Sequence, residues 1–458
     1  MNTDTIAAIA TALSNAGLSI IRISGSDALS IIDKIYQSKS GKKVLSQQES
    51  HTVHYGYIVD NDQIIDEVMV LVLKAPNTYT REDIVEIDCH GGVIVTKKIL
   101  ETVIKYGARP AEPGEFTKRA FLNGRIDLSQ AEAVIDIIHA KSEYALASSV
   151  KQLKGGILDK VITVRESILR DIAFIEAALD DPEHISLEHF SEELSEHVEN
   201  DLDSLNKLLS SAENGRLLKE GVRTVILGKP NAGKSSLLNV LVGEDRAIVT
   251  DIAGTTRDTL EETINLHGVI LNIIDTAGIR ETEDIVEKIG VEKAKQSADN
   301  ADLIIYVIDG TKELDESDRN IIQFIQDRKA VVLINKTDLE TVVDSATIEQ
   351  LTGKKVFAIS AKGNTGIEEF SHYIKDLFFE GKLSYNDEVY ITNIRHKTAI
   401  LEAKDSLEQV KTSIENQMPE DFYSIDLMNA YEKLGEIIGE SVGEDLVNMI
   451  FKEFCMGK

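Results

Sequence analysis

The sequence predicts an α/β plus all-α chain, in which an α/β domain with a mostly parallel sheet and helices on both sides is inserted in a helical domain. A smaller, mixed α/β domain precedes both. Short apolar runs alternate with helix-like stretches between residues 217 and 378, which is typical of a parallel sheet covered by helices. Helical periodicity flanks that region on both sides, and a glycine-rich loop follows its first apolar run.

We expect four segments along the chain. Residues 1–118 form the mixed α/β domain, 119–216 and 379–458 form the two halves of the helical domain, and 217–378 form the inserted domain. In the helical part, Ser129 and Glu132 have the spacing of a capping box. Strand-like runs are expected at 19–23, 67–73, 83–88, 222–227, 269–274, 303–308, 330–334 and 355–359.

Composition limits the classes of partner. The net charge is −29, from 49 Lys and Arg against 78 Asp and Glu, and this argues against sequence-blind binding of nucleic acid. The two cysteines are too few for a disulfide framework, and no apolar run reaches the about 20 residues of a membrane span, so we expect a cytoplasmic protein without membrane contact. Seven basic residues either form a local basic patch or are ordinary solvated side chains on the surface of a small domain: Lys97, Lys98, Lys105, Arg109, Lys118, Arg119 and Arg125.

The glycine-rich loop, residues 228–235, has the pattern of a phosphate-binding loop (P-loop) between a strand and a helix. Gly228 and Gly233 allow the backbone to turn its N–H groups toward phosphates. Lys234 is placed to reach the terminal phosphates, and the Ser235 hydroxyl is a candidate ligand of Mg²⁺.

Three later clusters follow strand ends in the order that a guanine-nucleotide site requires: Asp275 to Gly278, Asn335 to Asp338, and Ser360 to Lys362. Asp275 to Gly278 is expected to hold the magnesium shell and to sense the terminal phosphate. Asp338, in Asn335 to Asp338, offers one carboxylate to the N1–H and 2-amino groups of guanine, a pair that adenine lacks. Together these motifs predict GTP binding by Asn231, Ala232, Gly233, Lys234, Ser235, Ser236, Asp275, Thr276, Ala277, Gly278, Asn335, Lys336, Asp338, Ser360, Ala361 and Lys362.

The stretch from residue 250 to 258 matches a mobile switch segment. Thr256 is expected to bind Mg²⁺ in the triphosphate state, whereas Arg257 is either an internal arginine finger or an ion-pair partner of Asp258. Ile279 stands where Ras-like switches place a water-orienting glutamine, so another polar group and another source of positive charge are needed. The further GTP contacts expected here are Thr250, Asp251, Ile252, Ala253, Gly254, Thr255 and Thr256.

The chain resembles the tRNA-modification GTPase family known as MnmE or TrmE. The likeness rests on Gly-Lys-Pro-Asn-Ala-Gly-Lys-Ser, Asp-Ile-Ala-Gly-Thr-Thr-Arg-Asp and Asp-Thr-Ala-Gly-Ile-Arg, and it extends to both ends of the chain. The resemblance implies that K⁺ replaces an arginine finger, held by Asn231, Thr250, Ile252 and Thr255. It also implies that Glu287 positions the attacking water and that two nucleotide domains close across a homodimer. From the residues alone, Glu287 reads as an exposed carboxylate at a helix start.

The resemblance further implies a folate-binding N-terminal domain that holds 5-formyl-tetrahydrofolate through Arg22, Glu86, Arg125 and Lys458. Arg81 departs from the glycine usual before Glu82. For Cys455, a role in the modification reaction and a buried structural thiol both remain open.

The implied function is GTP hydrolysis in the modification of tRNA wobble uridine, with a flavin-dependent partner protein that helps to install a carboxymethylaminomethyl-type group at carbon five. Two alternatives remain: a ribosome-assembly GTPase without modification chemistry, and a scaffold that binds GTP without hydrolysing it. The first usually carries a basic RNA-binding domain, which the acidic composition does not suggest.

Overall fold

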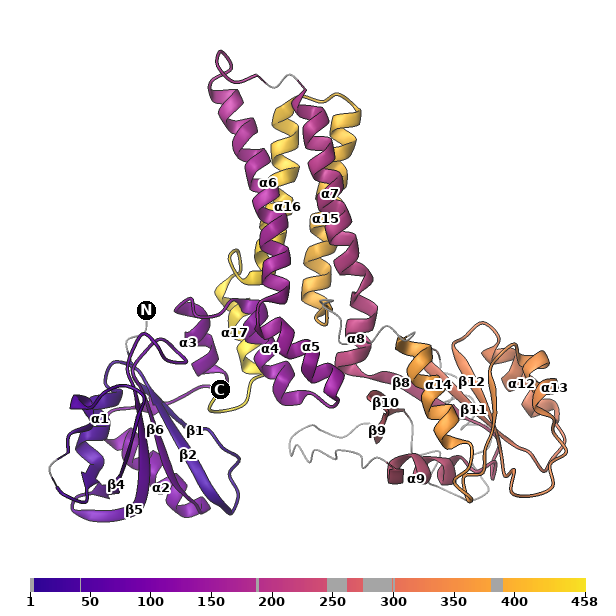
Figure 1. Ribbon diagram of the computed structural model, residues 1–458, viewed down its shortest axis with the longest axis horizontal. Coiled ribbons are helices and arrows are strands. Elements are labelled where there is room, and N and C mark those ends of the chain that lie inside the picture. The colour runs from indigo at the N-terminus through magenta and orange to yellow at the C-terminus, as the bar shows by residue number, and fades with distance from the viewer. Residues whose placement is uncertain are drawn as a thin grey trace. The chain divides into compact units, whose positions relative to one another are not determined.

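The structure is a computed structural model that describes residues 4–41, 43–186, 189–244, 262–274, 299, 301–379 and 390–458. The chain divides into two compact units. Unit 1 comprises Met1–Ile135, Gln152–Asp201 and Glu402–Lys458, and unit 2 comprises Asp136–Lys151 and Leu202–Leu401 (Figure 1). None of the described helices has the length and apolar character needed to cross a membrane.

A seven-stranded sheet forms the first part of unit 1, in the order β3-β4-β5-β6-β2-β1-β7. Its strands are antiparallel except for the pairing of β1 with β7. Helices α1 (Ala28–Ile35) and α2 (Val93–Lys105) cover one face and share a core with the strands. The strands are β1 (Ile6–Ile9), β2 (Ala16–Ser24), β3 (Tyr36–Ser38), β4 (Thr52–Asp60), β5 (Gln63–Leu73), β6 (Ile84–Gly91) and β7 (Arg109–Pro110), with a 3₁₀ turn η1 (Leu45–Gln47).

Helices follow the sheet. Those that lie wholly or partly in unit 1 are α3 (Glu115–Leu122), α4 (Leu128–His139), α5 (Glu143–Leu153), α6 (Gly156–Asp180), α7 (Phe190–Ser210), α15 (Ile394–Glu415), α16 (Glu420–Ile438) and α17 (Glu444–Lys452). Helix α6 packs on α16 through the predicted apolar stripe, whose six members Ile157, Val161, Val164, Ile168, Ile172 and Ile175 are all buried.

The start of α4 differs from the expected capping box. The helix begins one residue before Ser129, and the Asp127 carboxylate accepts hydrogen bonds from the N–H groups of Ser129 and Gln130 at 2.7 and 3.1 Å. The prediction of Ser129 as the cap is therefore wrong. An aspartate two residues upstream satisfies the same unpaired N–H groups of the first turn.

Unit 2 contains a six-stranded sheet in the order β13-β12-β11-β8-β10-β9, which is parallel except for the edge strand β9. The predicted alternation and the mostly parallel sheet are thus confirmed, whereas β9 was not anticipated. The elements are α8 (Ala212–Glu220), β8 (Val222–Leu227), α9 (Lys234–Glu244), β9 (Glu262–Leu266), β10 (Val269–Ile273), β11 (Leu303–Asp309), α12 (Glu316–Ile325), β12 (Ala330–Asn335), α13 (Ser345–Thr352), β13 (Val356–Ala358) and α14 (Ile367–Phe379).

Successive residues of the central strands point to opposite faces of this sheet, as strand geometry requires. On β8, Val222 and Ile226 join the core beneath α9 and α14, while Val225 and Leu227 join the core beneath α12 and α13. Helices therefore cover both faces. The loops at the carboxyl ends of the parallel strands meet at one edge, where ligands bind in sheets of this kind.

Candidate nucleotide site and a polar cluster at the chain's C-terminus

The P-loop joins the end of β8 to the start of α9. Asn231 and Gly233 have φ values of 63° and 96°, in the left-handed region that favours glycine. A Cβ added to Gly233 would collide with the side-chain amide of Asn335. The loop backbone therefore lies directly against the end of β12, and a larger residue would push the two apart.

Lys234 turns its ammonium group back into the loop. Its Nζ donates hydrogen bonds to the carbonyl oxygens of Gly228 and Lys229, at 2.8 and 2.9 Å. Burial lowers the pKa of Lys234, because an ammonium ion loses hydration there. The cation is thus held inside the ring of backbone groups that the sequence assigns to the phosphates.

Asn335 connects the P-loop to the loop after β13. Its side-chain amide N–H donates to the carbonyl oxygen of Ala232 at 2.9 Å, and its Oδ1 accepts from the N–H of Ala361 at 3.0 Å. Both hydrogen bonds are buried. One side chain therefore fixes the distance between the two loops that the sequence assigns to phosphate and base.

The predicted base-reading carboxylate is also held in place. Asp338 accepts a hydrogen bond of 2.6 Å from the hydroxyl of Ser360, whose oxygen accepts from the N–H of Gly363 at 2.9 Å. The Ser360 hydroxyl lowers the pKa of Asp338 and keeps the carboxylate ionised, which leaves it an acceptor for donors on a base. Lys336 donates to Asp309 at the end of β11, at 2.7 Å.

A second lysine of the P-loop has partners that sequence reasoning missed. The Nζ of Lys229 lies 2.9 Å from Asp315 and 2.6 Å from Asp318, and the hydroxyl of Tyr306 donates to Asp318 at 2.7 Å. Asp315 and Asp318 form the capping box of α12. The Asp-x-x-Asp spacing could have predicted this capping box from the sequence. The ion pairs of Lys229 with the two aspartates anchor the P-loop on α12.

In unit 1, two of the four predicted folate residues lie over one aromatic ring, and a third forms an ion pair with one of them. Arg22 and Glu86 face each other on β2 and β6 and form an ion pair of 2.7 Å. The guanidinium groups of Arg22 and Arg125 lie 5.8 and 4.6 Å from the centre of the Tyr79 ring. Tyr79 was not singled out, because nothing in its sequence neighbourhood marks it.

The C-terminal residues of the chain approach the same cluster. The Nη1 of Arg22 donates to the carbonyl oxygen of Gly457 at 3.1 Å, which places the adjacent Lys458 next to this cluster. Gly457 has φ 86°, and a Cβ there would collide with the backbone of Ile9 and Ala10. Cys455 is exposed, so the alternative of a buried structural thiol is wrong.

Two arginines of the candidate basic patch are neutralised by carboxylates. The buried guanidinium of Arg119 lies 2.9 Å from Asp4 and 3.1 Å from Glu82, and Arg109 pairs with both Asp4 and Glu115. These arginines therefore act as cross-links within unit 1 rather than as a basic surface. Arg81 takes φ 60°, in the left-handed region that glycine adopts without the steric cost of a side chain.

Comparison with known proteins identifies the family. Residues 128–455 match the family model described as the MnmE helical domain, and residues 5–125 match that described as the GTP-binding protein TrmE N-terminus. The chain belongs to the MnmE family of GTPases. It is 67% identical over 458 residues to the tRNA modification GTPase MnmE of Lachnoclostridium phytofermentans, covering 100% of both chains. It is 49% identical over 462 residues to that of Alkaliphilus oremlandii (99% of both) and 47% identical over 459 residues to that of Bacillus subtilis (99% of this chain, 100% of the relative).

Several residues predicted from the nucleotide motifs or implied by the MnmE resemblance lie outside the described part of the chain, so their placement stays a prediction. They comprise the expected switch segments, with Thr250, Asp251, Ile252, Ala253, Gly254, Thr255, Thr256, Asp275, Thr276, Ala277, Gly278 and Glu287. In the described part, Ser235 and Ser236 are exposed in the first turn of α9, and Lys362 is exposed beside Ala361.

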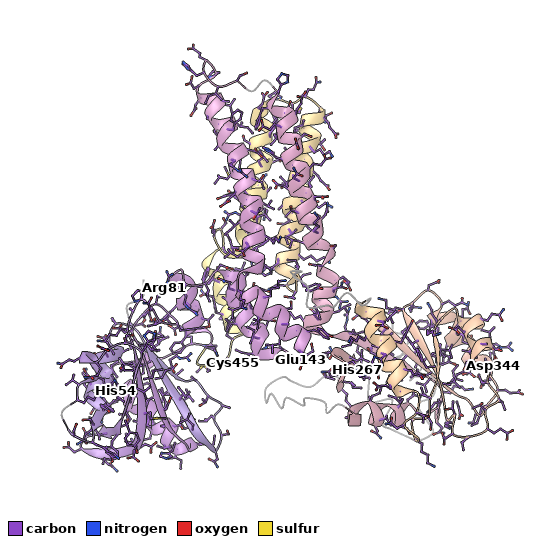
Figure 2. The ribbon with its side chains drawn as sticks, viewed as in Figure 1. His54, Arg81, Glu143, His267, Asp344 and Cys455 are labelled. Atoms are coloured by element: carbon purple, nitrogen blue, oxygen red, sulfur yellow. The ribbon has the colours of Figure 1, made fainter. Side chains whose placement is uncertain are left out.

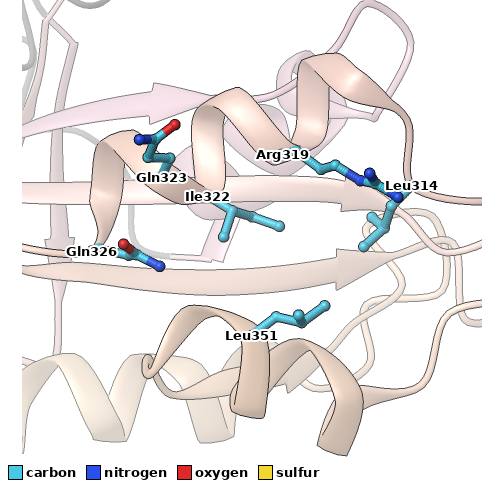
Figure 3. Close-up of a pocket in the computed structure, with 6 residues that line it drawn as sticks. All are labelled: Leu314, Arg319, Ile322, Gln323, Gln326 and Leu351. Atoms are coloured by element: carbon cyan, nitrogen blue, oxygen red, sulfur yellow. The ribbon is translucent and has the colours of Figure 1, made fainter.

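A separate cavity of about 350 Å³ lies between α12 and α13 (Figure 3). It is lined by Leu314, Arg319, Ile322, Gln323, Gln326 and Leu351. None of these residues belongs to the predicted nucleotide contacts. This cavity is therefore distinct from the nucleotide site of the MnmE family motifs.

Proposed function

We propose that this MnmE-family chain is a potassium-dependent GTP hydrolase that takes part in the modification of the wobble uridine of certain tRNAs. With a flavin-dependent partner protein, it contributes to the addition of a carboxymethylaminomethyl-type group at carbon five of the base. The observation that carries the nucleotide part is the Asn335 bridge, which joins the P-loop to the loop beside Asp338.

The described residues suit GTP. The ionised carboxylate of Asp338 accepts two donors from guanine, and the Lys234 ammonium supplies positive charge to the phosphates. The exposed Ser235 hydroxyl at the start of α9 would hold Mg²⁺ together with Thr256. Bound Mg²⁺ neutralises charge that develops on the phosphates during transfer.

Potassium would supply positive charge beside the phosphates, in the role that the MnmE resemblance gives it. Asn231 is exposed on the P-loop at φ 63°, and its side-chain oxygen would join Thr250, Ile252 and Thr255 in the ligand set. Glu287 would position the attacking water, and a homodimer would close two such sites face to face. A fixed cation beside the phosphates stabilises the transition state electrostatically.

The N-terminal domain would hold 5-formyl-tetrahydrofolate. The guanidinium groups of Arg22 and Arg125, the Glu86 carboxylate and the C-terminal Lys458 offer the donors and acceptors for a folate, beside the flat ring of Tyr79. The proposed domains remain 1–118, 119–216, 217–378 and 379–458. Bound folate would supply the one-carbon unit.

The hydrolysis test compares initial rates of GTP cleavage in KCl and NaCl at equal ionic strength. We expect faster cleavage in KCl, and we expect Asn231→Ala to abolish the difference between the salts. Asn416→Ala, on an exposed helix end, is the matched control and should behave as the unchanged chain does. Equal rates in both salts would overturn the potassium assignment.

The folate test uses calorimetry with 5-formyl-tetrahydrofolate. We expect binding to the full chain and weaker binding when Lys458 is deleted or when Arg22 is changed to Ala. Lys452→Ala, an exposed lysine at the end of α17, is the control. Absence of binding to the intact chain would reject the modification role and leave the assembly-switch alternative.

A further inference from the structure

The turn between β9 and β10 holds a histidine in a fixed backbone position. Leu266 pairs with Val269, so the turn consists of His267 and Gly268, with φ values of 49° and 92°. Positive φ at both positions is typical of a type I′ hairpin turn. The N–H of Gly268 donates to the Asn265 side chain at 2.8 Å, which fixes the turn further.

Two more metal-ligating side chains come from α14, which packs against β9. Glu368 and His372 are four residues apart and so share one face of the helix. The Nε2 atoms of His267 and His372 lie 3.3 and 3.2 Å from the same oxygen, Oε1 of Glu368. The two imidazole rings are stacked, with centres 4.6 Å apart and planes inclined by 9°. Figure 2 marks His267 in unit 2.

These separations match the edges of a metal coordination shell. With metal–ligand bonds of 2.0–2.2 Å, two ligands of a tetrahedral ion are about 3.3–3.6 Å apart. Both nitrogen–oxygen distances fall near this value, and the ligand atoms of the three residues all lie within 4.8 Å of one another. Because a bound ion lies in the plane of each imidazole, one of the two nearly parallel rings must rotate for both nitrogens to face the ion.

The ligand set selects the class of ion. Two imidazoles with one carboxylate suit zinc and its neighbours among the transition metals, whereas Mg²⁺ and Ca²⁺ prefer oxygen ligands alone. The side chains of His267, Glu368 and His372 are 35%, 68% and 61% exposed, so an ion and a water molecule have access from solvent.

We propose that His267, Glu368 and His372 form a zinc-binding site with water as the fourth ligand, and that the ion ties the β9–β10 hairpin to α14. The hairpin lies in the chain between the segments 245–261 and 275–298, which include the two predicted switch motifs. In the hairpin turn, the ring of Tyr144 contacts Gly268 closely enough to exclude a Cβ. Zinc therefore restrains the edge of the sheet that connects the two switch motifs.

The test is a calorimetric titration of the tag-free full chain, stripped with chelator and free of nucleotide, with Zn²⁺. We expect one ion per chain, and Co²⁺ bound at the same place should show the visible absorption of a tetrahedral site. His267→Ala and His372→Ala should each weaken binding by about tenfold or more, since changing even a group behind a ligand costs that much. His184→Ala is the matched control, because His184 is an exposed histidine that lies 2.8 Å from a single carboxylate, Asp181.

Thermal unfolding separates loss of the site from loss of the fold. In chelator, His372→Ala should unfold at the temperature of the unchanged chain, because the side chain is exposed. Zinc should raise the unfolding temperature of the unchanged chain but not that of the variant. Absence of zinc binding, binding unaffected by His372→Ala, or equal binding of Mg²⁺ would overturn the proposal and leave the cluster as an ion pair between imidazoles and a carboxylate.

Discussion

Replacement of Asn335 by alanine should disorganise the nucleotide site, although the substitution leaves the Asp338 carboxylate itself unchanged. The Asn335 side chain is 2% exposed and makes buried hydrogen bonds to Ala232 and Ala361. Alanine leaves one backbone carbonyl and one backbone N–H without this partner. Each unsatisfied buried group costs about 1–3 kcal/mol, so we expect a loss of about 2–6 kcal/mol for the two groups.

That loss should be visible in nucleotide affinity, because the bridge sets the distance between the P-loop and the base-side loop. A loss of 2 kcal/mol corresponds to about 30-fold weaker binding. Titration with fluorescent GDP measures the affinity, and urea unfolding measures the change in the free energy of unfolding. Asn416→Ala serves as the control, because the exposed Asn416 lies just after α15 and its amide donates to the carbonyl oxygen of Thr412 in the last turn of that helix.

Two outcomes would contradict this reasoning. A variant that binds GDP within twofold of the unchanged chain, with intact unfolding behaviour, would show that the bridge does not organise the site. A variant that loses stability but keeps its affinity would show that the two hydrogen bonds serve only the packing of β12.

Two further predictions concern single carboxylates. Asp338→Asn should weaken GTP binding by about 10–100-fold and favour xanthine nucleotides, whose second carbonyl accepts the new amide donor. Competition binding between guanine and xanthine nucleotides measures the change in selectivity. Unchanged selectivity would show that the base is read elsewhere. Burial raises the pKa of Asp201 to about 6, whereas an unfolded aspartate has a pKa of about 4. The contribution of Asp201 to the free energy of unfolding is therefore present below about pH 4 and is lost as the pH rises through about 6. Asp201→Asn should therefore raise the free energy of unfolding by about 2–3 kcal/mol near pH 8 and leave it unchanged near pH 4, as measured by urea unfolding. Lower stability of the variant near pH 8 would refute the raised pKa of Asp201.

Features that depend on local pattern could be predicted from the amino-acid sequence. The P-loop follows from glycine positions and from a strand-to-helix transition, and the parallel sheet follows from alternating apolar runs and helices. The apolar stripe of α6 follows from helical spacing. Each of these signals lies within a few turns or strands of the chain, where side-chain periodicity decides which face is buried.

Contacts between these local features could not be predicted in the same way, because they join residues far apart in the chain. Asn335 and Ala232 are 103 residues apart, and Arg22 and Gly457 are 435 apart, yet both pairs are hydrogen-bonded. The contact of His267 with α14 likewise depends on β9 being the edge strand, which the apolar runs did not reveal. Such contacts depend on strand order and on how helices cover the sheet, and the free energy that selects them comes from burial summed over the whole domain rather than from any local pattern.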